Sequence, residues 1–282
     1  MIDPVNYKIY FYSGSLNSGG FVEIDGINNL SFSKNLSISE AYFLGGLEAA
    51  KNINAPQEIQ LSFDRSFIQK DYFLNYTGKD PILKFFVYDG SQYYEMSNMY
   101  LKSYSAAFSV GDLPKINTTF VSYGTDIQQS PILRLGENNP VYTSIKYQVD
   151  IPNLDSIFLT GNFDENFKSK YKIYGFDYNI EINRQVYYSV GNAEPVEVSP
   201  ILPLRITSSI NSKVISTSKD FAYPNFINSN EKYLNFDIVV SGSGYLFNLP
   251  MQKTTLLNME SQFSSQNTFE IKRNFIGYHG LL

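Results

Sequence analysis

The stretch Leu30-Ser31-Phe32-Ser33-Lys34-Asn35-Leu36-Ser37-Ile38 places apolar residues at every second position, with Lys34 as the exception. A second stretch, Phe176-Asp177-Tyr178-Asn179-Ile180-Glu181-Ile182, repeats the alternation. Successive side chains of a β-strand point to opposite faces, so a period of two buries one set and exposes the other. Both stretches therefore predict β-strands that are buried on one face.

Outward from these two strands, further runs of strand-like composition are separated by turn signals such as Ser13-Gly14 and Asp89-Gly90. Helix signals are confined to residues 64–76, where Asp64 is a candidate N-cap, and to a weaker segment at 218–226. We predict a mainly β protein with antiparallel hairpins and one or two short helices. The remaining expected strands are 8–12, 58–63, 82–88, 100–110, 116–122, 143–149, 204–209, 234–240 and 268–273.

The second half of the chain resembles the first at a nearly constant offset. Tyr42–Gly45 matches Tyr188–Gly191, and Pro56-x-x-Ile59 matches Pro203-x-x-Ile206. Residues 82–90 align with 234–242, and 101–124 with 257–280. Such a pattern indicates a duplicated unit. We expect two tandem antiparallel β-barrel or β-sandwich domains, residues 1–124 and 152–282, joined by a connector at 125–151 that contains one strand.

Composition excludes several kinds of chemistry. The 282 residues include no Cys and a single His, His279, so thiol catalysis, disulfides and Cys/His zinc clusters are ruled out. The net charge of −5 argues against a basic surface that clamps nucleic acid. The start of the chain lacks a signal-peptide pattern, and no apolar run approaches the ~20 residues of a membrane helix. We expect no cofactor, no metal and no membrane anchor.

The order of the predicted elements resembles a known family. In each half an alternating strand leads to an x-Tyr-x-x-Gly element, a polar loop that ends in Pro, a fresh strand and a late hairpin. This order resembles the bacteriophage tail-tube fold, which the inner tubes of contractile injection systems share. The matching stretches are 28–64 with 100–123, and 174–209 with 257–278.

The resemblance implies a non-enzymatic virion protein, assembled in the host cytoplasm, whose subunits join edge to edge into rings. The rings stack into a tube through which DNA passes without specific binding, and other tail proteins are the further partners. Family rings usually have six barrels, so three chains would close a ring if the domain is duplicated, and six otherwise. Paired edges in a closed ring also avoid the uncontrolled association that open sheet edges invite.

The resemblance also suggests contact residues. The loops Gly45–Pro56 and Gly191–Pro203 would reach the next subunit or ring, with Leu44, Leu47, Val190 and Val196 as apolar contacts and Glu48 and Glu194 as polar ones. Charges on equivalent edges could select the correct neighbour: Glu23 and Asp25 in the first unit against Lys168, Lys170 and Lys172 in the second. The lysines could instead track phosphate, or protect a strand edge from mispairing.

Two other classes of protein stay open. The first is a two-domain β-sandwich of a phage baseplate, tail tip or surface that recognises protein or carbohydrate. The second is a glycan-cleaving enzyme, which needs a pair of carboxylates flanking the scissile bond. Because the chain has 27 acidic residues, some lie near one another in any fold, and we expect no catalysis. Candidate acids are Asp150, Asp155, Asp164, Glu165, Glu194 and Glu197.

Overall fold

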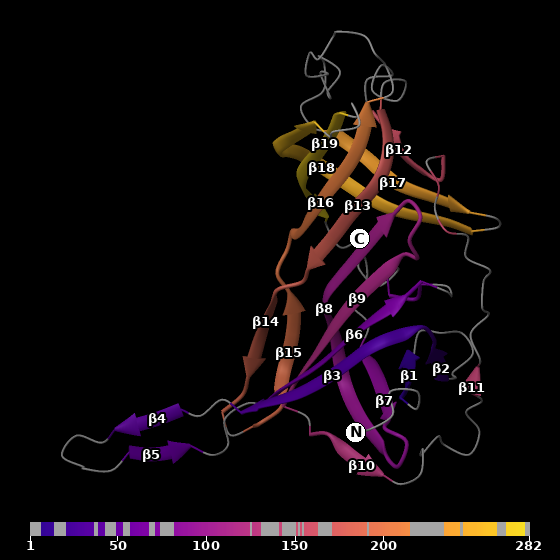
Figure 1. The fold of residues 1–282 in the computed structure, drawn as a ribbon. Helices are drawn as coiled ribbons and strands as arrows, with labels where there is room; N and C mark the ends of the chain where they lie inside the picture. Colours follow the sequence, from indigo (N-terminus) through magenta and orange to yellow (C-terminus); the bar gives the residue numbers. More distant parts are fainter. Residues whose placement is uncertain are drawn as a thin grey trace.

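The computed structural model describes most of the chain, and every regular element in the described residues is a β-strand. The prediction of a mainly β protein is therefore confirmed. Strands of the N-terminal half occupy the lower part of Figure 1, and most strands of the C-terminal half occupy the upper part. β14 (Arg184–Tyr188) and β15 (Pro195–Pro200) are exceptions that reach down beside the N-terminal half. The described residues are 7–13, 21–36, 39–42, 49–52, 57–67, 71–73, 82–124, 126–130, 141–142, 151, 153, 155–162, 171–190, 192–214, 234–242, 245–263 and 269–279.

The predicted helix at 64–76 is wrong at its start, because Asp64 lies inside strand β6 (Gln57–Ser66). The side chains of β6 alternate between buried and half-buried to its end, and Arg65 takes a buried position. Residues 67 and 71–73, the other described part of that segment, are not helical. The second expected helix, 218–226, lies outside the described residues.

Six strands of the first half of the chain pair side by side in a single order. β3 (Ile27–Leu36) pairs with β6, which pairs with β9 (Lys115–Tyr123), and β9 pairs with β8 (Tyr93–Ser109). β8 also pairs with β7 (Leu83–Tyr88), and β7 with β1 (Lys8–Ser13). All these pairs are antiparallel, and the short turns at 89–92 and 110–114 account for the pairs β7–β8 and β8–β9.

The second half repeats this order strand for strand. β13 (Tyr171–Glu181) pairs with β16 (Leu204–Val214), then come β19 (Phe269–His279) and β18 (Tyr245–Phe263). β18 pairs in turn with β17 (Leu234–Gly242), and β17 with β12 (Ile157–Gly161). Because the same path of six antiparallel strands occurs twice, we refer to the two halves as the first and second repeat.

The longest strand of each repeat changes partner at a kink. In β8, Asn98 has a φ of 55°, and in β18, Lys253 has a φ of 47°. Residues other than glycine rarely adopt this left-handed conformation. β8 pairs with β7 as far as Met99 and with β9 from Tyr100 onward. In the same way, β18 pairs with β17 as far as Thr254 and with β19 from Thr255 onward. One kinked strand thus belongs to both layers of each repeat.

Rows of paired residues give the equivalence between the repeats. Phe32, Leu61, Phe120 and Leu101 pair in turn across β3, β6, β9 and β8. The matching row across β13, β16, β19 and β18 is Tyr178, Ser208, Phe275 and Leu256. The predicted alignment of Leu101 with Leu257 is therefore wrong by one residue, which matters because a one-residue slip exchanges the two faces of a strand.

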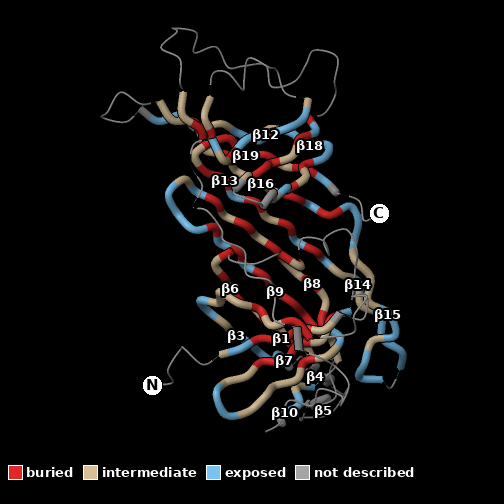
Figure 2. Tube along the Cα trace, turned by 90° about the vertical axis from the view of Figure 1, so that its right-hand side faces the viewer, coloured by how far each residue is buried: buried red, intermediate tan, exposed pale blue. Residues whose placement is uncertain are grey.

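Each repeat is a two-layered sandwich with an apolar core. In the first repeat, Phe63 and Phe120 of one layer meet Phe85 of the other, and the rings of Phe85 and Phe120 lie 4.6 Å apart between centroids. In the second, Phe236 meets Phe275 at 5.3 Å. Figure 2 shows buried residues as short segments along most strands of both repeats. β3 is an exception, since its side chains at residues 27–35 are all half-buried or exposed, so the buried face predicted for this strand is wrong. The described strands form an open path, so the barrel alternative is not supported by their pairing.

Shorter strands complete the fold. A hairpin follows β3 in the first repeat and β13 in the second. The first hairpin is β4 (Ser39–Tyr42) with β5 (Ala49–Asn52), and the second is β14 (Arg184–Tyr188) with β15 (Pro195–Pro200). β2 (Phe21–Ile24) pairs with β1 and, in parallel, with β11 (Val141–Tyr142). β10 (Gln128–Ser130) pairs with β8. The strand expected at 143–149 in the connector lies outside the described residues.

Candidate assembly surfaces

The two repeats are joined by antiparallel pairing of β8 with β13, which we call the internal seam. The pairing runs over seven residue pairs, and a backbone hydrogen bond from Ile182 N to Lys102 O, 2.8 Å long, extends it at one end. The rings of Phe108 and Phe176 stack across the seam with centroids 4.8 Å apart. A single sheet of eight strands therefore crosses both repeats in the order β3, β6, β9, β8, β13, β16, β19 and β18.

Side chains on the core face of the internal seam are withdrawn from water. Tyr104 of β8 and Tyr178 of β13 are 0% and 1% exposed. The hydroxyl of Tyr178 donates a hydrogen bond to Pro250 O (3.2 Å), and burial raises the pKa of this phenol. The seam is thus packed as a protein interior and not as a contact between two separate surfaces.

A buried ionic network fixes β8 beside the seam. The hydroxyl of Tyr104 donates to one carboxylate oxygen of Asp71 (2.6 Å), and the other oxygen lies 3.1 Å from Nη2 of Arg65 and accepts the Phe73 N–H. Burial, followed by the Asp71 charge, raises the pKa of Tyr104 well above its usual value. Buried charges require such partners, so the network ties β6 and β8 to the segment at 71–73.

The strands equivalent to the two sides of the seam are sheet edges. β3 corresponds to β13, and the C-terminal part of β18 corresponds to the part of β8 that pairs with β13. In the described residues, β3 pairs with β6 alone, and residues 255–263 of β18 pair with β19 alone. Each of these strands therefore has one side of its backbone without a partner strand there.

Exposure differs accordingly between equivalent positions. Phe32 of β3 is 39% exposed, whereas its equivalent Tyr178, on a strand of the internal seam, is 1% exposed. Leu257 of β18 is 56% exposed. Apolar side chains beside open sheet edges are typical of surfaces that become covered on assembly. We call β3 and residues 257–263 of β18 the open edges.

The hairpin β14–β15, which we call the second arm, lies against the first repeat. Nη2 of Arg184 donates to Leu101 O (2.9 Å), and its guanidinium lies 4.9 Å above the ring of Tyr100. At the other end of the arm, the backbone of Ala193 covers Gly124, where an added Cβ would come within 2.5 Å of the Ala193 oxygen. The arm thus covers one end of the β8–β9 pairing, which begins at Tyr100 and Val121, and we call this place the end of β8 and β9.

Three of the six contact residues expected in the sequence lie on the second arm. Val190 and Val196 are 106% and 70% exposed, and Glu194 is also exposed. Their exposure leaves them available to another molecule. Leu44, Leu47 and Glu48 lie outside the described residues, between the two strands of the first arm (β4–β5).

The charges expected to select neighbours have partners within the chain. Glu23 of β2 lies 3.3 Å from Nζ of Lys8, and Lys172 of β13 forms an ion pair with Asp155. Asp25, in the turn that follows β2, also takes part in an interaction. Lys168 and Lys170 lie outside the described residues, and the selection of neighbours by these charges stays a prediction.

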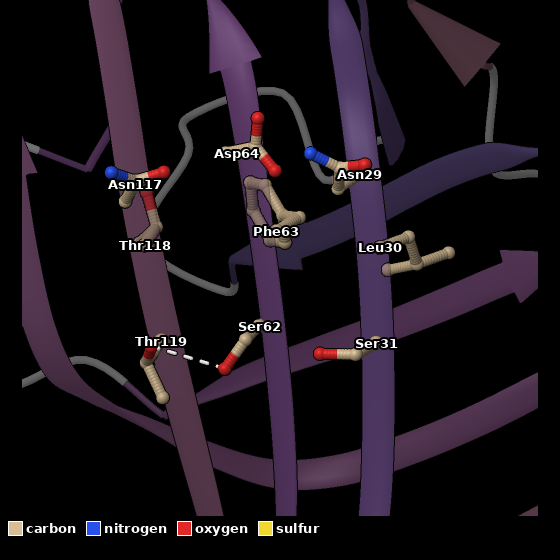
Figure 3. Close-up of a pocket in the computed structure, with 9 residues that line it drawn as sticks. All are labelled: Asn29, Leu30, Ser31, Ser62, Phe63, Asp64, Asn117, Thr118 and Thr119. Carbon is tan, nitrogen blue, oxygen red and sulfur yellow. Dashed lines mark hydrogen bonds between the residues drawn. The ribbon is translucent and has the colours of Figure 1, made fainter.

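A pocket of about 180 Å³ lies on the outward face of β3, β6 and β9. Figure 3 shows the hydroxyls of Ser62 and Thr119 meeting across two strands, 3.1 Å apart. The lining contains Asp64 as its only carboxylate, and it has no His and no Lys. This surface offers hydrogen bonds, but it does not present the paired carboxylates that glycoside hydrolysis requires.

No protein-family model matches the chain, and no curated protein matches it in sequence. Among the described residues, no group of three or more acidic, His or Cys side chains could hold a metal ion. No helix in the same residues is long and apolar enough to cross a membrane.

Sequence reasoning found the exposed part of the second arm but missed the open edges and the ionic network. The alternation in β3 and β13 is visible in the sequence, yet it does not say which strand pairs with which. Arg65 and Asp71 gave no signal, because a charge at a buried position is recognised only when its partner is known.

Proposed function

We propose that this protein is a structural subunit of a phage tail tube or a related tube-like assembly, and that it forms rings by pairing its open edges. The observation that carries the proposal is the internal seam. One repeat already joins the next edge to edge through β8 and β13. Among the strands that the structure describes, their equivalents, β18 and β3, lie open at the two ends of the same sheet.

Pairing of β18 in one copy with β3 in the next would continue the sheet by the same rule. Such a head-to-tail contact forms a closed ring when the rotation per copy closes, and an open filament when it does not. With two repeats per chain, three copies would supply the six units that the resemblance implies. Ring closure would cover both open edges of every copy.

The internal seam also gives the register of the proposed contact. Ser105 of β8 pairs with Asn179 of β13. Through the rows of paired residues, Glu260 is equivalent to Ser105 and Ser33 to Asn179. We therefore expect Glu260 of one copy to lie opposite Ser33 of the next.

The outward face of the eight-strand sheet suits a channel through which DNA slides. Its lysines are partly neutralised: Lys102 lies 3.2 Å from Glu58, and Lys213 lies 3.4 Å from Glu270. Without a surplus of positive charge, the face offers little counterion release on contact with phosphates. We expect it to line the lumen. Its uncharged residues include Ser31, Ser33, Ser62, Ser105, Thr119, Asn179, Thr207 and Asn274.

The first experiment is light scattering and negative-stain electron microscopy of the purified protein across a concentration series. The proposal predicts hollow rings with the mass of three chains, and tubes at higher concentration. A monomer at every concentration would contradict the proposal. It would instead favour a two-domain module of the baseplate or tail tip that recognises protein or carbohydrate.

The second experiment tests the register. Because the chain has no Cys, pairs of introduced cysteines report only on their own contact. Ser33→Cys with Glu260→Cys should cross-link between copies, since residues directly opposite in antiparallel strands have Cβ atoms ~5 Å apart. Ser105→Cys with Asn179→Cys is the matched control, which should cross-link within one chain. Rings that form without the Ser33–Glu260 cross-link would refute the proposed register.

A further inference from the structure

The two arms have different surroundings. The second arm (β14–β15) covers the end of β8 and β9 in the first repeat, through Arg184 and the backbone at Ala193. In Figure 1 the first arm (β4–β5) extends sideways away from both repeats. In the described residues its two strands pair only with each other. It is therefore a projecting hairpin that adjoins no other sheet among the described strands.

The surface equivalent to the one beneath the second arm is uncovered. Leu257, at the start of the β18–β19 pairing, is 56% exposed, whereas its equivalent Lys102 beside the second arm is half-buried. Tyr123, at the end of β9, is half-buried, but Tyr278, at the matching end of β19, is 41% exposed. The end of β18 and β19 thus presents an apolar surface to solvent.

We propose that the first arm of one copy lies on the end of β18 and β19 of the next copy, as the second arm lies on β8 and β9 within the chain. This inference rests on the proposed pairing of the open edges, which would bring the two surfaces together. Just past the internal seam, Ile182 N donates to Lys102 O, and Arg184 then starts the second arm. Their equivalents are Leu36, at the end of β3, and Leu257.

The first arm suits this surface. It begins at Ser39, three residues after the last residue of β3, so it would emerge directly beside Leu257 of the neighbour. Within the arm Ala41 pairs with Ala50 and Tyr42 with Ala49. Small residues allow a hairpin to approach an apolar surface closely. The occupant of the β18–β19 end is therefore a second copy of this chain, contributing its first arm.

A cross-linking experiment tests the contact. Tyr188 ends β14 at the position that Tyr42 has in β4. Burial chiefly raises the pKa of Tyr123, and Tyr188 lies near enough to add to that shift through its charge. Tyr188→Cys with Tyr123→Cys, treated with a short bismaleimide, should therefore cross-link within one chain. Tyr42→Cys with Tyr278→Cys should cross-link between copies instead and give a covalent ladder that ends at three chains. Each single-cysteine variant should give no ladder.

The outcomes separate this inference from the proposed function. Rings with the expected mass and no Tyr42–Tyr278 cross-link would overturn the arm contact and leave the ring intact. A cross-linked dimer without rings would support the arm contact and contradict ring closure. If neither rings nor the cross-link form, both are wrong. Rings that carry the cross-link support both.

Discussion

Replacing Phe32 by Ser should weaken association between copies and leave the monomer folded. Phe32 is 39% exposed on an open edge, and its equivalent Tyr178 is 1% exposed beneath the internal seam. Covering Phe32 to the same degree would remove ~80 Å² of a side chain of ~200 Å² from water. At ~25 cal/mol per Å², this area contributes ~2 kcal/mol to each contact between copies.

A loss of ~2 kcal/mol corresponds to a ~30-fold weaker contact, which sedimentation equilibrium resolves. Phe158→Ser is a matched control, because Phe158 is also 39% exposed but lies on β12, away from the open edges. Phe32 also contacts Tyr94 within the chain, with ring centroids 5.2 Å apart, so thermal unfolding of both variants must be compared. Equal weakening by both substitutions, or none by Phe32→Ser, would refute the assignment of β3 as an assembly edge.

Three further predictions concern stability. Tyr104→Phe should lower the free energy of unfolding in urea by ~1.5–3 kcal/mol, since it removes a buried hydrogen bond to the Asp71 carboxylate; an unchanged midpoint would contradict the network. Gly124→Ala should destabilise by at least ~1 kcal/mol and make the second arm more sensitive to protease, because Gly124 has a φ of 81° and no room for a Cβ. Burial and the hydrogen bond to Glu270 raise the pKa of Tyr174 to about 12, so the neutral phenol is favoured in the folded state. This stabilisation is complete below pH ~10 and is lost as the pH rises toward 12. The melting temperature of Tyr174→Phe should therefore fall less between pH 10 and 12 than that of the wild type. An equal fall in both proteins would contradict a raised pKa at Tyr174.

Much of the fold follows from local patterns. The alternation in β3 and β13 predicts both strands, and the turn dipeptides predict the hairpins. The buried face is predicted correctly for β13 but not for β3, whose side chains at residues 27–35 are half-buried or exposed. The repeat is visible because equivalent strands keep apolar residues at equivalent positions, such as Ile59 and Ile206. These signals depend only on neighbouring residues, so one sequence is enough to read them.

Most of the errors arise where contacts between residues distant in the sequence determine the structure. Arg65 interrupts the apolar alternation of β6, and its burial is possible only because Asp71 supplies the opposite charge. Without knowledge of that contact, Asp64 reads as a helix N-cap. The one-residue slip at Leu101 has a local cause instead: the alignment matches Gly124 with Gly280, although the second repeat has the extra residue His279 between Tyr278 and that glycine. The internal seam was beyond prediction, since strand pairing across the repeats is a tertiary choice.

The covalent union of two repeats has a kinetic consequence. In the proposed ring of three chains, every second seam is the internal one and forms during folding, at the effective concentration of a tethered partner. Assembly then needs the encounter of three bodies in place of six, so its rate depends far less steeply on the amount of protein in the cell. Ring formation could begin early in synthesis, while subunits are still scarce, and incomplete rings would be few.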